Sequence, residues 1–198
     1  MELVLASASP RRAELMAQVG WTCDIMPVDI AEDLRSDIPI KAAIMELALR
    51  KAQAGAANVA NAGAGLVIAA DTVVVIDNRV LGKPASEQEA SAMLQTLSGR
   101  EHRVITGVAV ISLAQGEYMV EAEETGVVFK ALTDAEIARY VASGEPMDKA
   151  GAYGIQGKGA ILVKSINGCY FNVVGLPLTR LAGMLQAFGY TKAYSFSD

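Results

Sequence analysis

The chain has 198 residues, of which 52% are hydrophobic, and its formal net charge is −5 at pH 7. This length fits one domain with a sizeable core, and the negative charge argues against a broad binding surface for polymeric nucleic acid. The N-terminus has no basic segment followed by a long apolar run, and no apolar run is long enough to span a membrane, so we expect a cytoplasmic protein that does not bind membranes.

The first half of the chain alternates predicted strands and helices. Residues 2–6 predict a buried strand, and Ser9-Pro10 supplies an N-cap and a first-turn proline for a helix that ends near Gly20. The next predicted elements are an extended segment at 22–28, an acidic irregular stretch at 29–37, a long helix at 39–58, a Gly/Ala/Asn turn region at 61–65 and a strongly apolar strand at 66–76.

The second half predicts hairpins and capped helices. A turn at Asp77-Asn78 follows the apolar strand, and the pairs Ser86/Glu89 and Thr133/Glu136 predict capping boxes for helices closed by Gly99 and Gly144. The other predicted elements are strands at 103–113 and 118–130, a glycine-rich loop at 150–159, a hairpin turning at Asn167-Gly168 and a helix at 178–188. This order is typical of an α/β protein with a mixed, twisted sheet.

The first chemical signal is the segment Ser7-Ala8-Ser9-Pro10-Arg11-Arg12. Cations at a helix N-terminus lie against the positive end of the helix dipole, so an anion is needed to offset them. Free backbone amides, the hydroxyls of Ser7 and Ser9, and the guanidinium groups of Arg11 and Arg12 together favour a phosphate site. A solvated helix start is the alternative interpretation.

Two charged residues interrupt apolar faces of predicted elements. Lys51 follows Ile40 by three helical turns, which places it on the inward face of its helix, where it can either snorkel to solvent or reach an anion pocket. Arg50 is expected to point to solvent. Asp71 interrupts the apolar strand at 66–76, and a buried carboxylate needs a cation, a metal or a hydrogen-bond partner, so we favour a functional role over a purely structural one.

Lys83 and Glu32 are weaker candidates from position alone. Lys83, in Gly82-Lys83-Pro84, offers a second cation that could return toward Asp71, although a solvent-exposed lysine in a turn is an equal alternative. Glu32 lies in the acidic stretch and would offer a second carboxylate for a divalent ion if that stretch folds over the pocket.

The glycine-rich segment from Asp148 to Gly157 matches neither a Walker P-loop nor a dinucleotide fingerprint. Tyr153 could stack on a base and Gln156 could read the edge of that base, whereas an ordinary hinge loop is the alternative. His102 is the only histidine and has no serine or cysteine nucleophile pattern near it, which disfavours a Ser-His-Asp or Cys-His site.

Several blocks of the sequence together resemble the Maf family of nucleotide pyrophosphatases. They are Ser7–Arg12, Ala69–Val74, Leu81–Pro84, Leu97–Gly99, Asp148–Gly157 and Asn172–Leu178, and they span nearly the whole chain. The resemblance implies an elongated fold like that of inosine triphosphate pyrophosphatases, with two lobes and a nucleotide cleft within residues 1–190 and a flexible tail at 191–198. It also implies hydrolysis between the α- and β-phosphates.

The late loop resembles one branch of that family. Its form Ala-Tyr-Gly-Ile-Gln-Gly is similar to the branch that acts on dTTP and UTP, whereas the branch that acts on 7-methyl-GTP usually carries an acidic residue where Gln156 stands. By position, Asp71 would be the proton acceptor, and Arg12, Thr72 and Gln156 would set base preference. The remaining pocket residues would be Ser7, Ser9, Glu32, Lys51 and Lys83.

The mechanism we expect from this resemblance needs a divalent metal, Mg²⁺ or Mn²⁺. The ion would bridge the triphosphate and one or both of Asp71 and Glu32, while Lys51, Lys83 and Arg12 would neutralise charge on the leaving pyrophosphate. The expected partner is a nucleoside triphosphate, and the family also allows a homodimer. Two alternatives stay open: a nucleotide-binding regulator of cell division or septum formation with incidental hydrolysis, and a phosphatase that releases orthophosphate from another metabolite.

Overall fold

The computed structural model describes residues 1–59 and 65–194, which form two compact units. Of these residues, the first unit holds 1–59, 65–71, 106–123 and 175–194, and the second unit holds 72–105 and 124–174. The expected single domain with two lobes stays a prediction. Within the expected tail, Thr191–Tyr194 form the short 3₁₀ helix η4, and residues 195–198 lie outside the described part of the chain.

The strands belong to one mixed sheet of seven strands, in the order β2-β1-β3-β5-β6-β7 with β4 paired to β3. Their bounds are Glu2–Leu5 for β1, Asp24–Ile25 for β2, Gly65–Ile76 for β3, Arg79–Leu81 for β4, Glu101–Ser112 for β5, Tyr118–Phe129 for β6 and Val163–Asn167 for β7. The strand β1 pairs in parallel with β2 and β3, whereas β4 and β7 pair antiparallel with β3 and β6. The expected α/β protein with a mixed sheet is confirmed.

Helices flank this sheet. The α-helices are α1 (Pro10–Gln18), α2 (Ile40–Asn58), α3 (Glu87–Leu97), α4 (Asp134–Val141), α5 (Tyr170–Val174) and α6 (Leu178–Ala187), and three more 3₁₀ helices are η1 (Glu145–Asp148), η2 (Ala150–Ala152) and η3 (Gly157–Leu162). No helix in the described ranges combines the length and the apolar character needed to cross a membrane.

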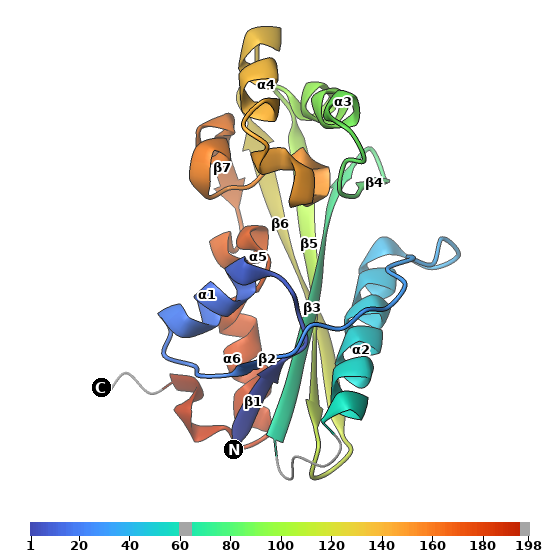
Figure 1. Cartoon of the computed structure of the whole chain (residues 1–198), viewed down its shortest axis with the longest axis vertical. Coiled ribbons are helices and arrows are strands. Elements are labelled where there is room, and N and C mark those ends of the chain that lie inside the picture. The colour runs from blue at the N-terminus through green and yellow to red at the C-terminus, as the bar shows by residue number, and fades with distance from the viewer. Residues whose placement is uncertain (60–64, 195–198) are drawn as a thin grey trace. The chain divides into compact units, whose positions relative to one another are not determined.

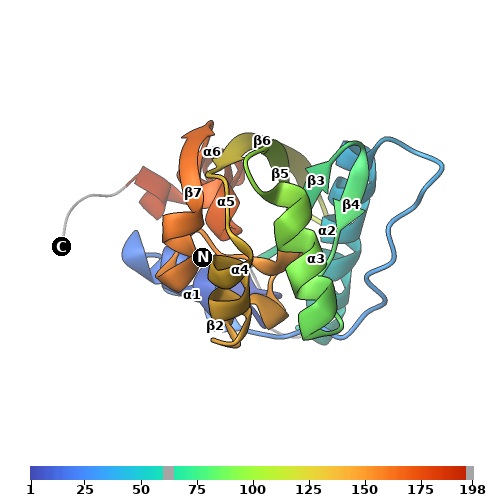
Figure 2. The same ribbon diagram turned by 90° about the horizontal axis from the view of Figure 1, so that it is seen from above.

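In the first unit, α2 covers one side of β1 and β3, while α1 and α6 lie on the other side (Figures 1 and 2). Small residues bring α2 close to the strands. A Cβ atom added to Gly55 of α2 would lie 2.7 Å from Ala6 Cβ, and one added to Gly107 of β5 would lie 2.5 Å from the Ile44 carbonyl oxygen. This close packing fixes the height and rotation of α2, and therefore the position of Lys51 on its inner face.

The second unit has its own apolar core, built where α3 and α4 pack with the ends of the long strands. The aromatic rings of His102, Phe129 and Tyr153 form a T-shaped cluster inside it, with centroid separations of 4.7 to 5.4 Å. All three residues are at most 5% exposed. The glycine-rich loop is therefore anchored in the core through Tyr153.

The capping predictions are confirmed for one helix and only partly for the other. Thr133 and Glu136 form a complete capping box on α4. At α3 the Ser86 hydroxyl accepts from the Glu89 amide, but the Glu89 carboxylate accepts from Ala85 N at 2.7 Å, one residue before the expected partner. At α1 the Ser9 hydroxyl occupies the N-cap position without capping any described amide of the helix.

Two strand predictions were wrong in extent or in kind. The extended segment at 22–28 forms only the two-residue strand β2. The hairpin at Asn167-Gly168 does not form, because the chain leaves β7 and enters α5. The Thr125 hydroxyl exchanges hydrogen bonds with the backbone N–H and C=O of Cys169, which draws the chain out of the strand direction. Of the expected turn region at 61–65, only Gly65 is described, and it begins β3.

Candidate active site

The loop after β1 places Ser7 and Arg12 against each other. The Ser7 hydroxyl is buried and accepts hydrogen bonds from Ser9 N and from Arg12 Nη1, each at 3.2 Å. The Arg12 Nε donates to the carbonyl oxygen of Gly175 at 2.8 Å, which ties the first turn of α1 to the segment before α6. The Ser7 hydroxyl, the Ser9 amide and the Arg12 guanidinium therefore lie together. A phosphate site that also uses the Ser9 hydroxyl and Arg11 stays a prediction.

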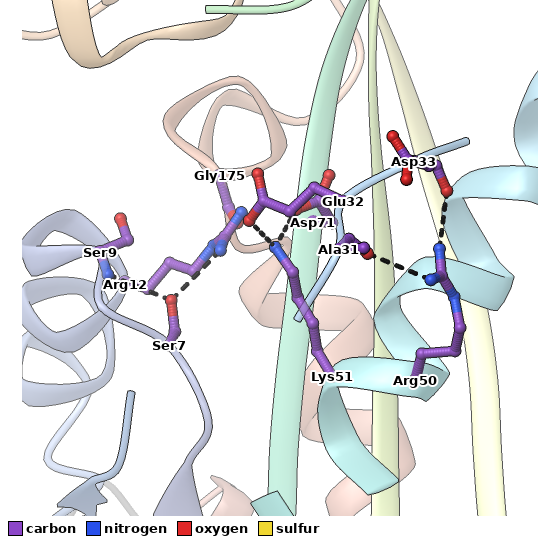
Figure 3. A network of polar contacts seen from close by, with 10 residues as sticks. All are labelled: Ser7, Ser9, Arg12, Ala31, Glu32, Asp33, Arg50, Lys51, Asp71 and Gly175. Carbon is purple, nitrogen blue, oxygen red and sulfur yellow. Dashed lines mark hydrogen bonds and ion pairs between the residues drawn. The ribbon is translucent and has the colours of Figure 1, made fainter. Parts of the chain in front are cut away.

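The central feature of the site is a cluster in which Lys51 forms ion pairs with Glu32 and Asp71 (Figure 3). The Lys51 ammonium donates to Glu32 Oε1 at 2.6 Å and to Asp71 Oδ1. The Lys51 and Asp71 side chains are only 9% and 14% exposed, whereas the Glu32 side chain is 53% exposed. The inward position of Lys51 is confirmed, and the cation that Asp71 needed is this lysine.

Arg12 adds a second positive charge beside these carboxylates. Its guanidinium end points toward the carboxylates of Asp71 and Glu32 (Figure 3). Burial lowers the pKa of Arg12, and the negative charges of Asp71 and Glu32 act in the opposite direction. An arginine stays protonated at neutral pH even so. The site thus brings two cations and two carboxylates together, which is a suitable arrangement for a substrate that carries phosphates.

Arg50 is a site residue that the sequence analysis missed. Its Nη1 and Nη2 atoms donate to the carbonyl oxygens of Ala31 at 3.1 Å and Asp33 at 2.7 Å, on both sides of Glu32 (Figure 3). The prediction that Arg50 points to solvent was wrong: the residue is half-buried, and its Nε finds no partner among the described residues. The signal that could have indicated this contact is the pair of adjacent cations Arg50 and Lys51, on the helix that follows an irregular stretch whose carbonyl groups can accept hydrogen bonds.

Three other predicted residues belong to the second unit. Thr72 is half-buried in β3, Lys83 is exposed after β4, and Gln156 is half-buried at the start of η3. Thr72 follows Asp71 directly in the same strand. That Thr72, Lys83 and Gln156 join the cluster of the first unit stays a prediction.

Tyr153 is not the base-stacking residue that the loop suggested, so that prediction was wrong. It is 5% exposed, and its hydroxyl lies 2.8 Å from His102 Nε2 inside the core of the second unit. Burial raises the pKa of Tyr153 and lowers the pKa of His102 to about 4. His102 is therefore a neutral core residue at pH 7, because its pKa lies well below the ordinary value near 6.5.

The two carboxylates of the site suit a divalent ion that binds together with its substrate. No group of three or more His, Cys, Asp and Glu side chains that could hold a metal gathers within residues 1–59 and 65–194. Glu32 and Asp71 nevertheless converge on one point, the Lys51 ammonium. Magnesium takes oxygen ligands, commonly from one or two carboxylates, and completes its shell with water and substrate phosphates. Glu32 and Asp71 fit that pattern.

Known proteins are similar to this chain over nearly its whole length. The family model described as Maf-like protein matches residues 2–188. This chain belongs to the Maf family. The relatives include a dTTP/UTP pyrophosphatase of Pelotomaculum thermopropionicum, 52% identical over 96% of this chain and 97% of its own, and one of Moorella thermoacetica, 53% identical over 95% of each chain.

A solved structure was also found for a more distant protein. It is the nucleoside-triphosphatase / dITP/XTP pyrophosphatase of Mycobacterium abscessus, which is 14% identical to this Maf-family chain over 96% of it and 97% of its own chain, with a TM-score of 0.44. The resemblance to the Maf family that the sequence motifs indicated is confirmed by the family match and by the relatives at about half identity.

Proposed function

We propose that this Maf-family chain hydrolyses dTTP and UTP to the nucleoside monophosphate and pyrophosphate. The observation that carries the proposal is the cluster in which the Lys51 ammonium binds Asp71 and Glu32, with the Arg12 guanidinium alongside. Relatives named dTTP/UTP pyrophosphatase match this chain over nearly its whole length, which supports the same substrates and the same bond.

Asp71 is the proton acceptor in this proposal. Its carboxylate lies at the inner end of the cluster, where the bond from Lys51 fixes its orientation and keeps a positive charge beside it. It orients or deprotonates the water that attacks the α–β phosphoanhydride, and the bond to the bridging oxygen breaks as pyrophosphate leaves. Lys51, Lys83 and Arg12 neutralise the charge that develops on this leaving group, because positioning and electrostatics carry most chemistry of this type.

Other residues complete the proposed site. Glu32 and Asp71 would hold Mg²⁺ or Mn²⁺ against the triphosphate, and the ion would supply charge neutralisation and polarise a phosphate oxygen. Ser7 and Ser9 line the phosphate corner, and Arg12, Thr72 and Gln156 set base preference. A cytoplasmic location and a homodimer stay predictions from the sequence.

The test measures pyrophosphate and orthophosphate separately, for a panel of nucleoside triphosphates with Mg²⁺, with Mn²⁺ and with a chelator. We expect metal-dependent pyrophosphate release that favours dTTP and UTP. Asp71→Asn should lower turnover by about 10²- to 10⁴-fold, the range for loss of a general base. It should keep the fold and nucleotide binding, because Lys51 retains Glu32 as a partner.

The matched control is Asp77→Asn, at the end of the same strand. Asp77 is exposed, its φ of +49° suits asparagine, and its pair with Arg100 lies at the surface. This variant should keep wild-type turnover.

Unchanged turnover in Asp71→Asn would show that Asp71 is not the proton acceptor. Tight, stoichiometric binding with no turnover would favour the regulatory alternative, and release of orthophosphate would favour a phosphatase.

A further inference from the structure

The loop that carries Gln156 is held from both sides by one pair of side chains in the second unit. Tyr140, at the end of α4, is 6% exposed, and Glu145 follows it at the start of η1. The Tyr140 hydroxyl donates to Glu145 Oε1 at 3.0 Å. We refer to Tyr140 and Glu145 as the loop anchor.

The anchor binds backbone amides on each side of Gln156. Gly154 N, two residues before it, donates to the Tyr140 hydroxyl at 3.2 Å. After it, Lys158 N donates to Glu145 Oε2 at 2.9 Å and Gly159 N donates to Glu145 Oε1 at 3.0 Å. A carboxylate that accepts backbone N–H groups forms charge-assisted bonds, which are stronger than those between neutral groups. These hydrogen bonds hold the backbone on both sides of Gln156.

Glycines allow the backbone to come this close to the anchor. A Cβ atom on Gly157 would lie 2.9 Å from Glu145 Oε2, and one on Gly159 would lie 2.6 Å from the Tyr140 hydroxyl oxygen. Gly157 also has a φ of +67°, which turns its neighbouring amides toward one point. The glycines of this loop thus allow its backbone to contact the side chains of Tyr140 and Glu145. This role argues against the interpretation of the segment as an ordinary hinge loop.

The charge state of the pair suits this contact. Burial acts to raise the pKa of Glu145, but the hydrogen bonds from Lys158 N, Gly159 N and Tyr140 outweigh it, so the pKa lies below its usual range. Burial also raises the pKa of Tyr140, which keeps the phenol protonated as a donor. Glu145 is therefore ionised and Tyr140 neutral at pH 7.

We propose that Tyr140 and Glu145 are positioning residues for base preference, which fix the loop so that Gln156 meets the pyrimidine in one orientation. This inference rests on the proposed function, because it deepens the role of Gln156. A side chain on a fixed backbone loses less conformational freedom when it binds, so its hydrogen bonds discriminate between bases more sharply. Neither anchor residue needs to touch the nucleotide.

The test compares Tyr140→Phe and Glu145→Gln with the wild type on UTP, dTTP, CTP and GTP. We expect kcat/KM for UTP and dTTP to fall about tenfold, mainly through KM, while the values for CTP and GTP change little, as expected for a loss of positioning. Thermal denaturation checks that each variant folds. The matched controls are Tyr118→Phe and Glu117→Gln, neighbouring exposed residues in the first unit, which should match the wild type.

A double-mutant cycle separates positioning from a general structural effect. In a Gln156→Ala background, Tyr140→Phe and Glu145→Gln should lower base preference no further, because the group that they position is gone. Additive losses would overturn the inference, and so would equal losses for all four nucleotides. If both anchor variants unfold, the pair is required for folding and the inference is also overturned.

Binding measurements keep this inference distinct from the proposed function. Calorimetry on the Asp71→Asn background compares the affinities for UTP and CTP without turnover. A wild type that releases no pyrophosphate refutes the proposed function, and the affinity ratio then tests the anchor alone. The inference stands if the anchor variants lower the ratio of the affinity for UTP to the affinity for CTP. It fails if they leave this ratio unchanged, or if the protein with intact anchor residues binds both nucleotides equally.

Discussion

Two irregular segments of this protein are held by anchors of opposite chemistry. In the first unit, the cationic Arg50 binds carbonyl oxygens of the acidic stretch on both sides of Glu32. In the second unit, the anionic Glu145 and the Tyr140 hydroxyl bind amides of the glycine-rich loop on both sides of Gln156. In each case the anchor flanks one side chain that the proposed function uses.

The two anchors differ in charge because one binds backbone carbonyl groups and the other binds backbone amide groups. A carbonyl group accepts hydrogen bonds and an amide group donates them, so the side chain that binds each segment carries the complementary charge. The amide-bound loop also needs glycines with positive φ to turn successive N–H groups toward one carboxylate, as at Gly157. The carbonyl-bound stretch has no glycine between 29 and 38 and no positive φ among those residues.

The largest expected effect on stability comes from protonating His102, the side chain that binds Tyr153 in the glycine-rich loop. His102 binds Tyr153 and has a pKa lowered to about 4 by burial. The unfolded chain binds this proton near pH 6.5, so stability is fully present above pH 6.5 and is lost as pH falls toward 4. The total loss should be about 3 kcal/mol, of which about 2 kcal/mol is lost by pH 5.

Urea denaturation of the wild type and of His102→Gln between pH 5 and pH 8 measures this effect. His102 is the only histidine, so the variant should lose most of the pH dependence in the range above the carboxylate pKa values. The free energy of unfolding of the wild type should rise with pH there. Parallel curves for the two proteins would show that His102 is already protonated or already accessible in the folded state.

The second effect tests how closely the loop approaches its anchor. In Gly159→Ala the new Cβ would lie 2.3 Å from the Gly154 carbonyl oxygen and 2.6 Å from the Tyr140 hydroxyl, so backbone must move. We expect a loss of about 2 kcal/mol in the free energy of unfolding, within the range for overpacking. Urea denaturation at pH 8 measures it.

The matched control is Gly183→Ala in α6, where an added Cβ meets no described atom within 4 Å. Alanine is the better helix former there, so this variant should gain about 0.5–1 kcal/mol. The two substitutions are chemically identical, and their effects should have opposite signs. A gain in Gly159→Ala would show that the loop is not pressed against the anchor.

The sequence predicted the features that depend on neighbours along the chain. The helical periodicity of residues 40–51 placed Lys51 inward. The apolar run around Asp71 required a cation, a metal or a hydrogen-bond partner, and the structure supplies Lys51 as a cation. The turn at Asp77-Asn78 forms with φ values of 49° and 59°, as its residue types favour. The Thr133 capping box needed only a spacing of three residues.

Three of the wrong predictions involve partners that are far away in the sequence. Tyr153 is buried because His102, 51 residues earlier, binds its hydroxyl. The expected hairpin fails because Cys169 pairs with Thr125, 44 residues earlier. Arg50 turns from solvent because it meets carbonyl groups 17 and 19 residues earlier. Local pattern gives the preference of a segment, whereas tertiary contacts of this kind decide where its polar groups go.

The smallest expected effect is that of Arg50→Gln on pyrophosphate release, and it tests whether the two anchors have different roles. Arg50→Gln removes the two bonds that hold the backbone beside Glu32, so Glu32 should reach Lys51 for a smaller share of the time. We expect pyrophosphate release to fall about tenfold, as for a loss of positioning. The loss should be equal for UTP and CTP, because Glu32 acts on the triphosphate and its ion in the proposed function and does not contact the base there. Steady-state kinetics on both nucleotides measures it.

The control for Arg50→Gln is Arg35→Gln. Arg35 lies in the same acidic stretch, but it is exposed and pairs through its side chain with Asp37 and Glu46 at the surface. Exposed pairs contribute little, so this variant should keep activity within about twofold. An unequal loss for UTP and CTP in Arg50→Gln would mean that the acidic stretch also influences base preference. Arg50 would then not act on hydrolysis alone, and the two anchors would not have separate roles in hydrolysis and in base preference. This holds even if both anchors bind their segments as in the structure.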